Sequence, residues 1–182
     1  MTMNGNPLLV WVLIALASTS LACATFAPNP APEVRPADFA VQYDWWEGSL
    51  PPPYHYEYSV TIAADGVGTV TYVPDYPSEQ TPTWVETFTL DAAQLDALYA
   101  QLRAADVFTT VWREADDIPV GGSSSVLTVT ANGATTTVPA FPDRVVEQAD
   151  AAKSAVYAVV PAEIWERLTA QRDQYVQENE AP

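Results

Sequence analysis

Three residue types that hydrolytic enzymes use, histidine, glutamate and serine, lie close together at His55, Glu57 and Ser59. A catalytic nucleophile and its base must approach each other to about 3 Å. The three residues alternate along one expected strand, where successive residues on the same face are about 7 Å apart. We interpret them as a solvated strand face. The sequence therefore predicts no catalytic site and no enzymatic activity.

Carboxylates that could bind a metal are concentrated in one loop, at Glu114, Asp116 and Asp117. Their spacing lacks the alternating carboxylates and the glycine of an EF-hand. One cysteine and one histidine exclude thiolate zinc sites and two-histidine sites. The run Gly121-Gly122-Ser123 lacks the lysine and the helix start of a phosphate-binding loop. We expect no metal and no cofactor, with calcium at the acidic loop as the alternative.

Aromatic residues are dense between residues 43 and 84. Side chains alternate between the two faces of a strand, so Trp45 and Trp46 should point to opposite faces, and we expect one of them to be exposed. The rigid turn at 51–53 should hold Tyr54 nearby. Exposed Trp and Tyr rings stack on sugars and anchor protein interfaces. Trp45, Trp46 and Tyr54 are therefore the candidate surface for a glycan or protein ligand, with core packing as the alternative for most rings.

The chain is strongly acidic, because 7 Lys and Arg oppose 23 Asp and Glu, for a net charge of -16. Nucleic-acid affinity depends chiefly on Lys and Arg that displace counterions, so a nucleic-acid partner is excluded. The same charge disfavours adsorption to anionic lipid headgroups. With 182 residues, the chain is long enough for one domain whose core needs no disulfide.

The first 38 residues have the composition of an export signal followed by a tether. Residues 8–17 form an apolar run that is shorter than the roughly 20 residues of a membrane-spanning helix and is typical of a secretory signal. Small residues then precede Cys23 in a pattern that resembles the lipobox of bacterial lipoproteins, in which this cysteine is lipidated. We expect a signal at 1–22, a proline-rich extended tether at 23–38 and a lipid on Cys23. A cleaved soluble signal and an uncleaved anchor are the alternatives.

Alternating apolar and polar residues, bounded by turn residues, predict six strands. The expected strands cover residues 39–46, 54–63, 68–73, 83–90, 124–131 and 134–138. Asn132-Gly133 between the last two is a strong signal for a tight hairpin turn. Asp65-Gly66 predicts a similar turn before the third strand.

Helical periodicity begins at Asp91, which can cap a helix reciprocally with Gln94. Leu95, Leu98, Tyr99 and Leu102 follow on one buried face. Asp143 is expected to cap a second helix, and Pro161 to start a last helix that ends near 176.

This order of elements contains no alternation of strand, helix and strand. It predicts an α+β fold, with an antiparallel sheet of about six strands and two or three helices packed on one face. The single domain should span 39–176, and residues 177–182 should form a frayed tail.

Seven short motifs resemble those of an uncharacterised group of bacterial secreted proteins and lipoproteins. They are Pro51-Pro52-Pro53-Tyr54, Asp65-Gly66-Val67-Gly68, 95–102, Gly121-Gly122-Ser123, 129–133, Pro139-Ala140-Phe141-Pro142 and 161–165. The order of strands, leucine-rich helix, Asn-Gly hairpin and helix is also similar, more distantly, to the small protease inhibitor emfourin. The resemblance covers most of residues 50–175 and implies the fold and an envelope location. Its motifs are turns and core positions, so it transfers no functional residue.

The sequence thus predicts a non-enzymatic binding module of undefined ligand, held at the bacterial cell envelope by a lipid on Cys23, or else secreted. A secreted protease inhibitor that acts by occlusion is the alternative function. A hydrolase is the second alternative.

Overall fold

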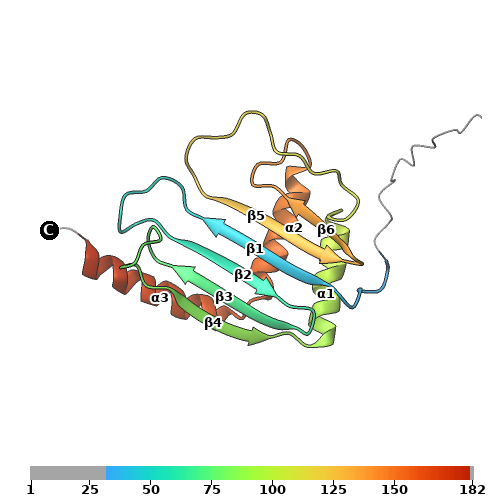
Figure 1. Ribbon diagram of the computed structural model, residues 1–182, viewed down its shortest axis with the longest axis horizontal. Helices are drawn as coiled ribbons and strands as arrows, with labels where there is room; N and C mark the ends of the chain where they lie inside the picture. The colour runs from blue at the N-terminus through green and yellow to red at the C-terminus, as the bar shows by residue number, and fades with distance from the viewer. Residues whose placement is uncertain (1–31, 181–182) are drawn as a thin grey trace, which may run out of the picture.

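The chain forms six strands and three helices in a computed structural model that describes residues 32–180 (Figure 1). The strands are β1 (Ala40–Trp46), β2 (Glu57–Ile62), β3 (Val67–Val73), β4 (Trp84–Thr89), β5 (Ser124–Ala131) and β6 (Ala134–Val138). The helices are α1 (Ala92–Ala104), α2 (Val146–Val159) and α3 (Ala162–Asn179). The expected export signal and Cys23 lie outside the described residues.

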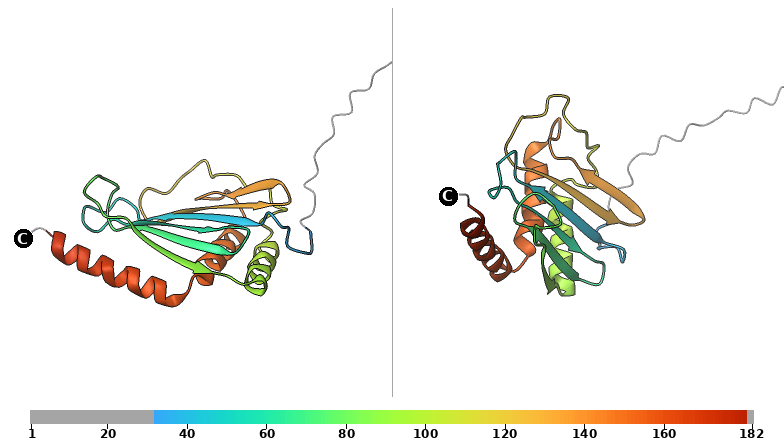
Figure 2. Two further views of the ribbon diagram at one scale, coloured as in Figure 1. Left: turned by 60° about the horizontal axis from the view of Figure 1, so that its bottom comes forward. Right: turned by 60° about the vertical axis from the view of Figure 1, so that its left-hand side comes forward.

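All six strands pair antiparallel, in the order β4-β3-β2-β1-β5-β6. The three helices cover one face of the sheet, and none of them lies on the other face (Figure 2). These observations confirm the predicted α+β fold. Within residues 32–180, no helix is both long enough and apolar enough to cross a membrane.

Alternation along the strands gives the sheet one apolar and one polar face. On β1, Val41 and Tyr43 are buried beneath the helices, whereas Gln42 points to the opposite side, which we call the open face. One cross-strand row on the open face crosses all six strands, through Thr87, Thr69, Thr61, Gln42, Thr128 and Thr137. These polar groups stay hydrated, so an antiparallel sheet can leave this face without a covering layer.

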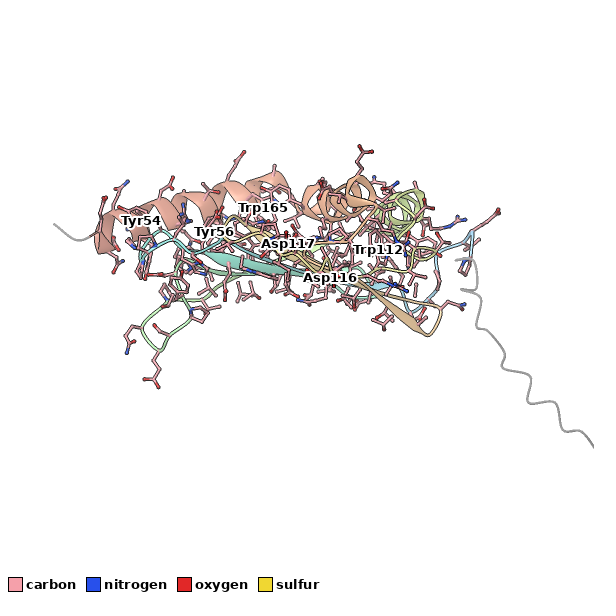
Figure 3. All side chains as sticks on the ribbon, turned by 90° about the horizontal axis from the view of Figure 1, so that it is seen from above. Tyr54, Tyr56, Trp112, Asp116, Asp117 and Trp165 are labelled. Carbon is pink, nitrogen blue, oxygen red and sulfur yellow. The ribbon has the colours of Figure 1, made fainter. Side chains whose placement is uncertain are left out.

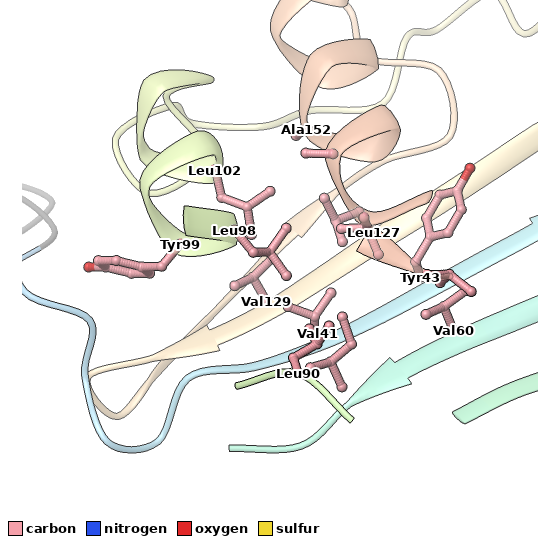
Figure 4. Packing of buried hydrophobic residues seen from close by; sticks show 14 of the residues in the cluster. Val41, Tyr43, Val60, Leu90, Leu98, Tyr99, Leu102, Leu127, Val129 and Ala152 are labelled. Carbon is pink, nitrogen blue, oxygen red and sulfur yellow. The ribbon is translucent and has the colours of Figure 1, made fainter. Parts of the chain in front are cut away.

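The start of α1 is fixed by the predicted capping box. The Asp91 carboxylate accepts the backbone N–H of Gln94 at 2.8 Å, and the Gln94 side chain accepts the backbone N–H of Asp91 at 2.9 Å. Leu98 and Leu102 on the buried face of α1 then pack toward the sheet (Figure 4). Local capping and long-range packing therefore specify the same helix.

The second helix starts later than the sequence indicates. The backbone N–H of Asp143 donates to the carbonyl of Arg113 at 2.9 Å, so this residue belongs to a loop. Val145 precedes α2 with a φ of 53°, and no side chain caps the helix. The prediction that Asp143 is the cap is therefore wrong. α3 follows Pro161 as predicted and extends to Asn179, past the expected end at 176.

Residues 32–38, the last part of the expected tether, are bound to the folded domain. The Tyr99 hydroxyl donates to the carbonyl of Pro32 at 2.9 Å. The Arg35 guanidinium pairs with the Asp96 carboxylate at 2.7 Å. The described chain therefore begins beside α1, at the end of the sheet where β1 starts (Figure 1).

Asp38 stabilises the turn between β5 and β6. Its carboxylate oxygens accept the backbone N–H groups of Asn132 at 2.7 Å and Gly133 at 2.6 Å. These two turn residues have φ angles of 54° and 73°, as a tight hairpin turn of the Asn-Gly type requires. The two hydrogen bonds favour the charged carboxylate, so they hold the pKa of Asp38 below its usual range.

Replacing Asp38 with alanine should lower the melting temperature at neutral pH, and the deficit should shrink in acid. The folded-state pKa is below the unfolded value of about 3.9, so the stabilisation is complete above that pH and is lost as the pH falls through the folded-state pKa. Thermal unfolding followed by circular dichroism from about pH 7 to about pH 2 measures this effect. Asp116→Ala, which removes an exposed carboxylate, is the control, and an acid-independent deficit in Asp38→Ala would contradict the assignment.

Candidate ligand-binding site

Four aromatic side chains form a row across the helix-covered face of the sheet. Trp84, Tyr72, Tyr58 and Trp45 occupy directly opposed positions on β4, β3, β2 and β1. Adjacent rings stack, with centroids 5.7, 6.1 and 5.0 Å apart and interplanar angles of 17°, 10° and 14°. We call this row the aromatic ladder.

The interior of the aromatic ladder is packed core. Tyr72 and Tyr58 have a stacked ring on either side, so their faces are already occupied. α3 contacts the row from above, and Trp165 meets Tyr58 edge-on, with centroids 4.9 Å apart and an interplanar angle of 65°. Burial raises the phenol pKa of both tyrosines, because it disfavours the charged phenolate. For these two rings, the structure therefore supports core packing, which was the alternative to a ligand surface.

Trp45 ends the aromatic ladder on the side of β5. The residue opposite it on β5 is Ser125, which is buried and carries no ring. The face of Trp45 that is turned away from Tyr58 is consequently not covered by another ring of the ladder. Trp45 is half-buried, and it lines a pocket of about 450 Å³ that we call the Trp45 pocket.

Two loops, the start of β5 and one side of α2 enclose the Trp45 pocket. Its lining residues are Trp45, Ala115, Asp117, Pro119, Ser123, Ser124, Ser125, Ala140, Phe141, Pro142, Val146, Asp150 and Lys153. The two loops bind each other, since the backbone N–H of Ala115 donates to the carbonyl of Phe141 at 2.7 Å. The Phe141 N–H in turn donates to the Glu114 carboxylate at 2.9 Å. These hydrogen bonds fix the two loops, so the pocket is pre-formed. Its volume is within the range that small ligands occupy.

A buried cation forms part of the pocket wall. Lys153, the only lysine of the chain, is 7 % exposed. Its ammonium donates to the carbonyls of Pro139 at 2.8 Å and Ala140 at 3.3 Å. Burial lowers the pKa of Lys153, while the nearby carboxylates of Asp150 and Glu114 oppose that shift. Lys153 therefore ties α2 to the loop that follows β6.

Sequence reasoning did not select Lys153, although a signal was present. Lys153 falls on the buried stripe of α2, beside Ala149, Ala152 and Val156. A lysine is rarely buried unless something pairs with it, so its place in this stripe indicated a polar partner. Asp150 and Ser125 carried no comparable signal, because only the fold brings them to the pocket.

Trp46 lies on the open face, opposite to Trp45, as alternation predicts. It lines a smaller groove of about 250 Å³ together with Asp44, Glu57 and Thr71. Both tryptophans are half-buried, so each is partly exposed and neither is fully exposed. Loops and neighbouring side chains shield each ring in part, and Trp45 has the larger adjoining pocket.

Tyr54 lies near the C-terminal end of α3 and does not line the Trp45 pocket (Figure 3). Its hydroxyl donates to the Glu180 carboxylate at 2.6 Å. Arg172 donates to its backbone carbonyl at 3.0 Å. The structure thus separates Tyr54 from Trp45, and the three residues predicted as one ligand surface occupy three places.

The hydrolytic residue types do not assemble either. His55 is buried and stacks on Tyr76, with ring centroids 3.9 Å apart and an interplanar angle of 4°. Its Nε2 atom lies 3.9 Å from a Glu57 carboxylate oxygen. Ser59 lines the groove on the open face, and within residues 32–180 no hydrogen bond joins it to His55. The three residues therefore do not form a catalytic triad.

The acidic loop forms no metal cluster. Over the part of the chain that the structure describes, no three His, Cys, Asp or Glu side chains are grouped to hold a metal ion. Glu114 instead accepts the backbone N–H of Phe141, whereas Asp116 and Asp117 are exposed. This arrangement does not support the calcium alternative for the loop.

No protein-family model matches this chain, and no curated protein matches it. The geometry of the Trp45 pocket therefore carries the functional inference. An aromatic face, three consecutive serines, two carboxylates and one ammonium surround the space. This set offers stacking, hydrogen-bond donors and hydrogen-bond acceptors to a bound molecule.

Proposed function

We propose that this protein is a non-enzymatic binding module of the bacterial cell envelope that holds a saccharide in the Trp45 pocket. The observation that carries the proposal is that Trp45 lines the pocket and that no ring of the ladder covers its face on the side of Ser125. A sugar ring has an apolar C–H face and a rim of hydroxyl groups. It therefore matches an aromatic face bordered by serine hydroxyls and carboxylates.

The pocket is organised before any ligand arrives. Trp45 is held from the β2 side by Tyr58 and also by Tyr56, whose ring centroid is 4.7 Å away. The loops of the pocket are joined by backbone hydrogen bonds, and Lys153 fixes one of them to α2. Little conformational entropy is lost when a rigid site binds, so even a modest number of contacts supports useful affinity.

The position of the pocket suits a protein that is tethered by its N-terminus. Residues 32–38 enter β1 at one end, and Trp45 is close to the other end, about 17 Å along the strand. With a lipid on Cys23, as the resemblance to bacterial lipoproteins implies, the tether would leave the pocket facing away from the membrane. The proposed partners are thus a membrane through Cys23 and a saccharide through Trp45.

A glycan screen tests the proposal with the purified full chain. Bacterial envelope polysaccharides and their oligosaccharide fragments are immobilised, and each positive is measured by titration calorimetry. We expect saturable one-to-one binding of at least one saccharide, without any turnover of it. Absence of saccharide binding together with inhibition of a secreted endopeptidase would contradict the proposal and favour the occlusion mechanism.

A further inference from the structure

We infer that the saccharide held in the Trp45 pocket carries a positively charged amino group, and that acidic saccharides are rejected. This inference rests on the proposed function and specifies its ligand class.

Two carboxylates at the pocket form no ion pair. Asp117 and Asp150 line the pocket from different elements, the loop before β5 and helix α2, and both are exposed. Within residues 32–180, which contain all seven Lys and Arg of the chain, neither carboxylate forms an ion pair. An ammonium group on a bound sugar would supply that missing partner.

Lys153 is close enough to Asp150 for their charges to interact, but its ammonium donates to backbone carbonyls and, within residues 32–180, forms no ion pair with Asp117 or Asp150. Its described hydrogen bonds go to Pro139 and Ala140. An ammonium has three N–H donors, so one remains for a ligand atom. Since the side chain is 7 % exposed and lines the pocket, that donor is suited to a sugar hydroxyl oxygen at the inner wall.

The charge of the whole molecule acts in the same direction. A net charge of -16 creates a potential that concentrates cations and repels anions near the surface. A uronic acid in the pocket would place its carboxylate beside Asp117 and Asp150. A neutral sugar avoids that repulsion but gains no attraction, so an amino sugar has the advantage over both.

Three saccharides of equal length separate the possibilities: a β-1,4-linked glucosamine tetramer, its N-acetylated counterpart and a galacturonic acid tetramer. Titration calorimetry with the full chain gives each dissociation constant. We expect the glucosamine tetramer to bind roughly fivefold or more tightly than the N-acetylated one at low ionic strength. This preference should largely vanish at about 1 M salt, where the Debye length is about 3 Å.

Variants that each remove one carboxylate show which residues cause the preference for the glucosamine tetramer. Asp117→Asn and Asp150→Asn should each weaken binding of the glucosamine tetramer more than binding of the N-acetylated tetramer, so the preference between the two should fall. Asp116→Asn is the matched control, because it removes the same charge from the same loop at a residue that does not line the pocket. An equal effect of all three variants would show general attraction to an acidic surface and would overturn the inference.

The other outcomes distinguish this inference from the proposed function. Equal or tighter binding of the N-acetylated or the acidic tetramer overturns the charge preference and leaves saccharide binding intact. Binding of a lysine-rich peptide in the pocket, with no saccharide bound in the glycan screen, overturns both proposals.

Discussion

Replacing Leu98 with alanine should lower the free energy of unfolding by about 2–5 kcal/mol, the range for truncating a fully buried leucine. Leu98 is 2 % exposed and lies on the buried face of α1, next to the central strands (Figure 4). The variant loses both the transfer free energy of the side chain and the contacts around the cavity that remains. Urea unfolding followed by circular dichroism measures the difference.

Leu50→Ala is the matched control for this prediction. Leu50 is 40 % exposed in the turn between β1 and β2, so the same chemical change should alter stability by less than about 0.5 kcal/mol. A comparable small loss for Leu98→Ala would show that α1 does not bury the face that its leucines define.

The first helix could be predicted because its signals are local and agree with one another. Asp91 and Gln94 satisfy each other across one turn, and the leucines repeat at helical spacing just beyond them. Asp143 has a similar capping signal in the sequence, but it does not cap α2. Its backbone N–H donates to the carbonyl of Arg113, and no local sequence pattern predicts a hydrogen-bond partner thirty positions away.

The hairpin of β5 and β6 was predicted with its observed bounds for the same reason. Asn132 and Gly133 adopt the positive φ angles that the turn requires, and the turn then fixes the register of both strands. The support from Asp38 was not predictable. It comes from a residue far away in the sequence, in the segment that composition had assigned to a tether.

The candidate site could be predicted only in part from the sequence, because its composition depends on the register in which the strands pair. Alternation correctly placed Trp45 and Trp46 on opposite faces. It could not show that Tyr58 would stack on one side of Trp45 while Ser125 stood on the other, since that follows from the pairing of β1 with β2 and β5. Tyr54 was grouped with the tryptophans because the rigid turn at 51–53 was expected to hold it nearby, yet the fold places it near the C-terminal end of α3.

Replacing Trp45 with alanine should weaken saccharide binding by about 10- to 100-fold, the loss of ~1.4–2.8 kcal/mol that a central aromatic contact supplies. The variant removes the stacking face and leaves the serines, Asp117 and Lys153 of the pocket in place. Titration calorimetry with the tightest-binding saccharide from the glycan screen measures the change. Trp45→Phe keeps a smaller ring at the same position, so it should retain most of the affinity.

Loss of the ring also removes one stacked contact of the aromatic ladder, which itself contributes roughly 0.5–1.5 kcal/mol. Trp84→Ala separates this effect from binding, because Trp84 ends the same ladder on β4 and does not line the pocket. Both alanine variants should lose similar stability, but only Trp45→Ala should lose affinity. Equal weakening of binding by the two variants would mean that the ladder as a whole supports the site, and that the uncovered face of Trp45 does not contact the sugar.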